Sequence, residues 1–178
     1  MNILNSDQPP MQEDKQSVKT DKGAQDAYDK FVINGLEILH NPETTDSIIK
    51  QVETNPDTIE GIGEAALNIV NRLEEGAYEN KFDFTANTVL NGLNVFVGEV
   101  ISIIEATGEP PIEDEQKFQA FSWAMSNYIS NAVRLGKVSK EELSQLSQEL
   151  GQTDEGKQIA QQMGRGAEQE RMLQTVGV

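Results

Sequence analysis

The chain has 178 residues, with 14 Lys and Arg against 30 Asp and Glu, so its formal net charge is −16. It has no cysteine and a single histidine, which excludes disulfides, thiolate metal sites and cysteine nucleophiles and disfavours sites built from several histidines. The acidic excess is concentrated in residues 1–120, and it argues against direct binding to nucleic-acid phosphates or anionic membranes, because both need clustered Lys and Arg.

The N-terminal third of the chain predicts an arm followed by helices. Residues 1–21 are polar and lack an apolar period, so we expect a flexible arm, or an arm that becomes ordered on a neighbouring subunit. Residues 23–40 carry apolar side chains three and four positions apart, which predicts an amphipathic helix. Asn41-Pro42 ends that helix and begins the next, since Asn is a good N-cap and Pro fits the first helical position. The same pair recurs at Asn55-Pro56 and predicts a further helix start.

Three glycines mark the helix that follows this second start. Gly61 and Gly63 lower helix stability, so we expect close packing at these two positions. Gly76 predicts the end of the helix, because glycine is the commonest residue just beyond a helix C-terminus. Residues 77–84 are then expected to form a connection.

The longest apolar segment runs from Thr85 to Thr107, and its polar and small residues follow one narrow helical stripe. A helix that is apolar nearly all round is the centre of a bundle or a membrane span. Glu99 and Glu105 interrupt the segment, and a span needs about 20 largely apolar residues. We therefore predict a central core helix, with an interface or membrane-active helix as the alternative. We also predict that its stripe and flank contribute a contact between subunits, through Asn87, Asn91, Asn94, Gly98, Val97 and Ile101.

A further amphipathic helix is predicted over residues 113–135, closed by Gly136. Most of its aromatic side chains share one face, which predicts that they lie in the core. Trp123 lies off that face, so we expect it in a subunit or partner contact rather than in a cofactor stack, since interfaces are enriched in Trp. Trp123 therefore completes the set of candidate interface residues.

The C-terminal region predicts one more helix and a tail. Ser139 and Glu142 form a capping box, followed by Leu143, Leu146 and Leu150 at helical spacing. Residues 152–178 are rich in Gln, Glu and Gly, which predicts a weakly helical or disordered tail. The predicted fold is thus all-α, a compact bundle of about six helices between residues 23 and 150, within a helical domain at 22–151 that has a flexible arm on each side.

The sequence offers no catalytic constellation. His40 ends a helix, where its charge would complement the helix dipole. Gly61-Ile62-Gly63 lacks the spacing and the preceding strand of a dinucleotide motif. The acidic run at 113–115 lies at a helix start, where the dipole explains it better than a metal does. We therefore predict a protein that is not an enzyme, with no catalytic, cofactor-binding or metal-binding residue.

Three segments, Gly35–Thr44, Asn87–Ile104 and Glu113–Leu146, together resemble small acidic helical virion proteins of tailed bacteriophages, which are encoded among portal, head and ejection proteins. The resemblance implies a structural component of the internal or ejection type, found in the virion and, during assembly, in the host cytoplasm. The implied partners are further copies of the chain and portal, tail or internal proteins, with contact to the host envelope during ejection. The resemblance supplies no site residues.

Two other functions remain open from the sequence. A scaffolding protein or assembly chaperone would be present in procapsids and missing from mature particles. An acidic inhibitor that imitates nucleic acid would need its carboxylates arrayed on one surface rather than scattered.

Overall fold

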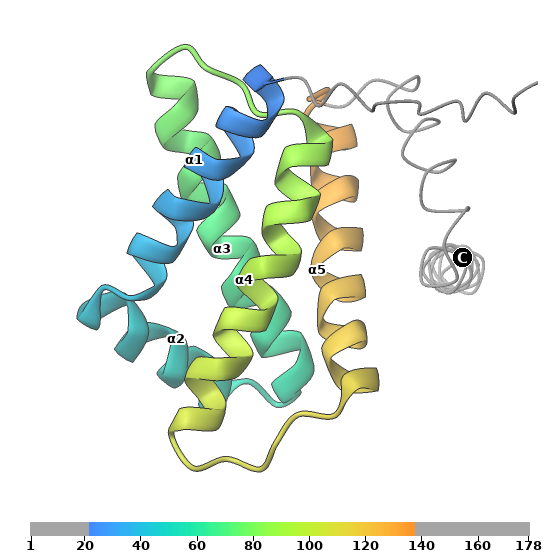
Figure 1. Ribbon diagram of the computed structural model, residues 1–178. Coiled ribbons are helices and arrows are strands. Elements are labelled where there is room, and N and C mark those ends of the chain that lie inside the picture. The colour runs from blue at the N-terminus through green and yellow to red at the C-terminus, as the bar shows by residue number, and fades with distance from the viewer. Residues whose placement is uncertain (1–21, 138–178) are drawn as a thin grey trace, which may run out of the picture.

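The computed structural model describes residues 22–137, and these fold into five helices without a strand among them (Figure 1). The helices are α1 (Lys22–Leu39), α2 (Pro42–Thr54), α3 (Thr58–Glu79), α4 (Ala86–Ala106) and α5 (Asp114–Arg134). The predicted all-helical bundle is confirmed, with five helices rather than about six in the described part. The sixth helix expected after Ser139, the N-terminal arm and the C-terminal tail lie outside the described residues.

The apolar helix α4 is the centre of the bundle, as its composition predicted. It contacts each of the other four helices, and Figure 1 shows it with α1 and α5 on its two sides. In that view α1 and α4 run in one direction, while α3 and α5 run in the opposite direction. The core is formed largely by the buried face of α4 together with α3, because both helices carry long apolar stripes.

Two reciprocal phenylalanine–glycine contacts join α1 to α4. A Cβ atom built on Gly35 of α1 would lie 2.0 Å from Cζ of Phe96, so the ring occupies the space that any larger residue would fill. A Cβ atom on Gly92 of α4 would lie 2.4 Å from Cδ1 of Phe31 in the same way. The two rings are fully buried, and their centroids are 5.5 Å apart. Each helix thus offers one ring and one glycine to its parallel neighbour, which brings the two helices close together.

The two Asn-Pro pairs behave differently. Asn41 caps α2 as predicted, since its Oδ1 accepts a hydrogen bond from the Glu43 amide at 3.1 Å and Pro42 is the first helical residue. The second pair does not begin a helix, because α3 is capped by Asp57, whose Oδ1 accepts from the Ile59 amide at 2.9 Å. Asn55 instead ends α2, and its Oδ1 accepts from the Asp57 amide at 2.9 Å, which folds the chain into the turn.

The end of α3 also differs from the prediction. Gly76 lies inside the helix with open space around its Cβ position, and α3 continues through Ala77 to Glu79. The helix ends where Lys81 adopts a left-handed conformation, with φ 57°. The Phe82 amide then donates to the Ala77 carbonyl at 3.0 Å, which completes a Schellman motif without glycine. The predicted connection over residues 77–84 is therefore shorter than expected at its start.

Gly136 ends α5 as predicted, through the same motif. Its φ is 68°, and the Lys137 amide donates to the Ala132 carbonyl at 2.8 Å. The expected close packing at Gly63 is also confirmed, because a Cβ atom there would lie 2.8 Å from the Ala120 carbonyl oxygen. At Gly61 the corresponding atom would lie 3.0 Å from Cβ of Asn55, so α2 and α3 also approach closely at their turn.

Candidate functional site

A row of small polar residues runs along the exposed side of α4. We call it the amide stripe, and it consists of Asn87, Asn91, Asn94, Gly98 and Ser102, all exposed. Within it, Nδ2 of Asn91 donates to Oδ1 of Asn87 at 2.9 Å, and Oγ of Ser102 donates to the Gly98 carbonyl at 3.1 Å. No atom lies within 4 Å of a Cβ built on Gly98, so none of the described helices packs on the stripe.

Two of the residues that we predicted at a contact between subunits are not on the exposed side of α4. Val97 and Ile101 are 2% and 3% exposed and belong to the core. Val97 and Ile101 each directly precede a residue of the amide stripe in sequence. Successive residues of a helix are rotated by about 100°, so these two side chains lie on the buried side. The structure therefore separates the predicted contact into an exposed polar part and a buried apolar part, and the buried part is accessible only if the bundle opens.

Trp123 is partly buried and packs against the core. Its Cε3 atom would lie 3.0 Å from a Cβ on Gly63, so the indole fills the space that this glycine leaves between α3 and α5. Trp123 thus has an intramolecular role at the junction of two helices. The sequence missed this role because no local spacing connects Gly63 with α5.

One carboxylate joins α3 to the end of α5. Oε1 of Glu74 accepts a hydrogen bond from the Tyr128 hydroxyl at 2.9 Å, and its Oε2 lies 3.0 Å from Nζ of Lys137. The Glu74 side chain is largely shielded from solvent, so both contacts are less screened than a surface pair. Glu74 is 54 residues from Tyr128 and 63 from Lys137 in sequence, and only the packing of α5 against α3 brings it to them.

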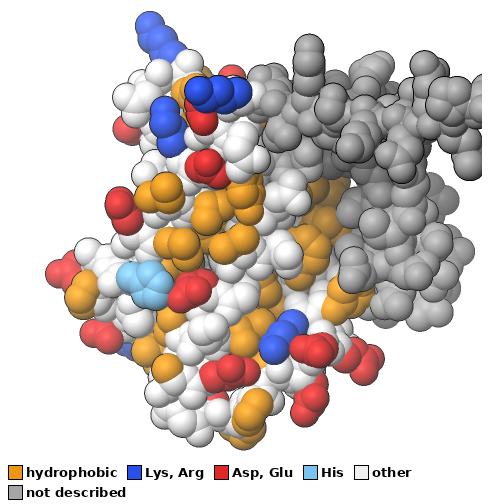
Figure 2. Space-filling model, in the orientation of Figure 1, with side chains coloured by type: hydrophobic (Ala, Val, Ile, Leu, Met, Phe, Trp, Pro, Cys, Tyr) orange, Lys and Arg blue, Asp and Glu red, His pale blue; other side chains and the backbone are white. Residues whose placement is uncertain are grey.

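The single histidine of the chain forms a contact that the sequence did not predict. Nε2 of His40 lies 3.0 Å from Oε1 of Glu99, which joins the end of α1 to the middle of α4. No group of three or more metal-ligating side chains is present in the part of the chain that the structure describes. On the face seen in Figure 2, the acidic side chains are scattered among apolar and uncharged ones.

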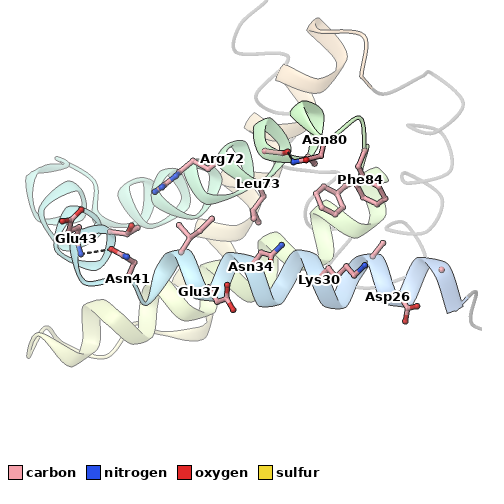
Figure 3. A pocket seen from close by; sticks show the side chains of 17 residues that line it. Asp26, Lys30, Asn34, Glu37, Asn41, Glu43, Arg72, Leu73, Asn80 and Phe84 are labelled. Carbon is pink, nitrogen blue, oxygen red and sulfur yellow. Dashed lines mark hydrogen bonds between the residues drawn. The ribbon is translucent and has the colours of Figure 1, made fainter.

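Two hollows flank α3. The first has a volume of about 870 Å³ and lies between α1 and α3, with Lys30 and Asn34 on one wall and Arg72 and Leu73 on the other. Figure 3 shows Leu73 and Asn34 in the space between these helices, with Phe84 at one end. Its lining mixes acidic, basic, amide and apolar groups, without a cluster that would suggest a particular reaction.

The second hollow has a volume of about 650 Å³ and lies at the C-terminal ends of α3 and α5. Glu74, Tyr78, Phe82 and Lys137 line it, and Tyr78 is 79% exposed. Both hollows are surfaces on which another polypeptide could pack, since their walls are helices and their apolar side chains are partly accessible.

Of the described helices, α4 alone is long and apolar enough to cross a membrane by length and composition, a test that the core helix of a soluble bundle also passes. More than half of its apolar window is buried inside this bundle. Comparison of the chain with models of protein families, with curated proteins and with solved structures finds no match.

Proposed function

We propose that this chain is a non-enzymatic component of a tailed-phage particle, of the internal or ejection type, which acts through helix–helix contacts with further copies of itself. The observation that carries the proposal is the dual character of α4. This helix has the length and composition of a membrane span, lies inside a bundle, and carries an exposed amide stripe. The resemblance of three segments to phage virion proteins supports the same function.

The amide stripe is suited to contact between identical subunits. An asparagine side chain both donates and accepts hydrogen bonds, so a stripe of asparagines can pair with a second copy of itself. Asn91 already donates to Asn87 within the chain, and Asn94 has free amide positions on the same side of the helix. The absence of a Cβ at Gly98 allows close approach of another helix just beyond the three asparagines.

An ejection role further requires that α4 leave the bundle when it meets an envelope. Polar side chains inside a bilayer face a lumen or a partner, so the amide stripe would line the interior of an assembly of several copies. Two acidic residues restrain this step. Glu99 is paired with His40 at the end of α1, so α4 must break this contact when it leaves the bundle. Oε1 of Glu105 accepts a hydrogen bond from the Ile112 amide at 2.8 Å, which ties the end of α4 to the connection before α5.

The contact between copies is tested by introducing like charges into the stripe. Asn91→Asp with Asn94→Asp places carboxylates opposite one another in any self-paired stripe, so sedimentation should show a shift towards monomer. Asn71→Asp, at an exposed position on α3, is the matched control and should leave the distribution unchanged. A wild-type chain that is strictly monomeric and absent from purified virions by mass spectrometry would contradict the proposal.

The membrane step is tested with a reversible cross-link. Because the chain has no cysteine, His40→Cys with Glu99→Cys can be joined by a cleavable bismaleimide, which holds α1 against α4. Before cross-linking, the double-cysteine variant should release dye from vesicles, most strongly at acid pH where carboxylates are neutralised. The cross-linked protein should not release dye until the linker is cleaved. Absence of leakage under every condition would contradict the ejection role.

A scaffolding protein is the second candidate, because exposed apolar side chains gather at the C-terminal ends of α3 and α5. Tyr78, Phe82, Val133 and Leu135 are between 45% and 79% exposed, which suits transient contacts with other assembly proteins. Mass spectrometry of procapsids and mature particles separates the two functions, since a scaffold is lost on maturation. An acidic inhibitor that imitates nucleic acid is less well supported on the face seen in Figure 2, where the acidic side chains lie among apolar and uncharged ones.

A further inference from the structure

The two hollows beside α3 are continuous. Both are lined by Ala77, Phe82 and Phe84, so together they form one groove that passes around the C-terminal end of α3. We call it the α3-end groove. It begins at Lys137, at the end of α5, and reaches the space between α1 and α3. Its continuity gives it the shape of a site for a short stretch of polypeptide rather than for a small molecule.

Apolar side chains are exposed in and beside this groove. Tyr78 and Phe82, which line it, are 79% and 47% exposed, and Leu135 in the adjoining turn is 59% exposed. Single exposed apolar residues are common on soluble proteins, but a group of them at one end of a bundle marks a surface that is covered by another segment. The occupant should therefore present an apolar face.

The described part of the chain ends inside this groove. Lys137 lines it, and its position is fixed by two contacts: its amide donates to the Ala132 carbonyl at 2.8 Å, and its Nζ lies 3.0 Å from Oε2 of Glu74. The residues that follow Lys137 thus start at the groove. Their local concentration there exceeds that of any separate partner, because attachment by a short linker makes the contact intramolecular.

The sequence after Lys137 has the pattern that the groove requires. Ser139 and Glu142 form a capping box, and Leu143, Leu146 and Leu150 follow on one face of the predicted helix. A helix of this segment would be about 18 Å long. It has only three leucines on an otherwise polar surface, so its stability depends on packing that face against another apolar surface.

We propose that the segment Ser139–Leu150 docks in the α3-end groove of its own chain, with its leucine face against Tyr78 and Phe82. The docked segment covers the apolar end of the bundle and competes for it with any protein partner. This inference does not depend on the proposed place of the chain in a phage particle, because it rests on the groove and on the point where α5 ends.

Cross-linking in the full-length chain tests the docking, since the native sequence has no cysteine. Glu75→Cys lines the groove, and Ser144→Cys lies on the polar side of the predicted helix, so a short bismaleimide should join them within one chain. The control pair is Asn91→Cys, on the exposed side of α4, with the same Ser144→Cys. We expect about tenfold more intramolecular product from the groove pair, because docking raises the local concentration.

A pair of matched substitutions tests the leucine face. Leu146→Asp, added to the groove pair, should reduce its cross-linking to the level of the control pair, because a charge cannot pack against the apolar groove. Gln148→Asp adds the same charge two positions further along, on the opposite, polar face, and should leave the yield unchanged. Circular dichroism of both variants should remain helical, since neither residue belongs to the described core.

Three results would each overturn the proposal. The first is equal yield from the groove pair and the control pair. The second is a product that joins two chains, which would assign the groove to a second copy. The third is an equal effect of Leu146→Asp and Gln148→Asp, which would show that the leucine face does not contact the groove.

Discussion

The two sides of α4 use glycine in opposite ways. On the buried side, Gly92 leaves space that the ring of Phe31 fills, so the absence of a side chain permits contact between helices. On the exposed side, nothing lies within 4 Å of the Cβ position of Gly98, and the absence of a side chain serves no contact within the described bundle. Glycine inside a helix lowers stability by about 1 kcal/mol relative to alanine. Within a single chain, packing offsets this cost at Gly92 but not at Gly98.

The largest effect is expected from removing a ring on the buried side. Phe96→Ala deletes a fully buried side chain that packs against Gly35 and Phe31, so the free energy of unfolding should fall by about 3–5 kcal/mol. Urea denaturation followed by circular dichroism measures this change. Phe82→Ala, at a residue that is 47% exposed, is the control and should cost much less. Equal losses would contradict the central place of the α1–α4 contact.

A smaller loss is expected from filling the buried glycine. Gly92→Ala places a Cβ 2.4 Å from the Phe31 ring, which the surrounding core prevents from moving freely, so unfolding should become easier by about 1–3 kcal/mol. The double variant Phe31→Leu with Gly92→Ala tests the cause. If the clash with the ring is responsible, the loss in the double variant should be smaller than the sum of the two single losses.

The corresponding change on the exposed side should stabilise the protein. Gly98→Ala adds a methyl group into open space and improves helix propensity, so the free energy of unfolding should rise by about 0.5–1 kcal/mol. Gly76→Ala in α3 repeats the test at a second site and should also raise the free energy of unfolding, since its Cβ position is also open. A fall in stability for Gly98→Ala, observed only at concentrations where the chain associates, would instead locate a subunit contact at Gly98.

The smallest effect is expected at the amide pair of the stripe. Asn91→Ala removes an exposed hydrogen bond to Asn87, whose amide then bonds to water, so stability should change by less than about 0.5 kcal/mol. Thermal melts at low protein concentration measure it. A larger loss that grows with protein concentration would show that the stripe is covered by another copy.

The features predictable from sequence were those set by neighbouring residues. Helical spacing located α1 and α4, Asn41-Pro42 located the start of α2, and apolar composition placed α4 at the centre. The end of α3 was predicted wrongly. We expected a left-handed residue at Gly76, whereas Lys81, five residues later, adopts that conformation. A lysine there is uncommon, so local preference pointed to the wrong residue.

The features that could not be predicted join residues that are distant in sequence. The pairing of Phe31 with Gly92 and of Phe96 with Gly35 depends on how α1 crosses α4, and no spacing within either helix indicates it. The contacts of Glu74 with Tyr128 and Lys137 and the packing of Trp123 on Gly63 arise in the same way. The sequence showed the amide stripe, but it did not show that Val97 and Ile101 are buried in the core.

The parallel arrangement of α1 and α4 has a consequence for the order of folding. Two parallel helices cannot be joined by a tight turn, so the chain must return along the bundle between them, and here it does so through α2 and α3. Closing so long a loop costs conformational entropy, which favours the nearer pairs α3–α4 and α4–α5 as the folding nucleus. We therefore expect α1 to dock late and to be the first helix to detach, so that Phe31→Ala should accelerate unfolding far more than it slows refolding in a chevron analysis.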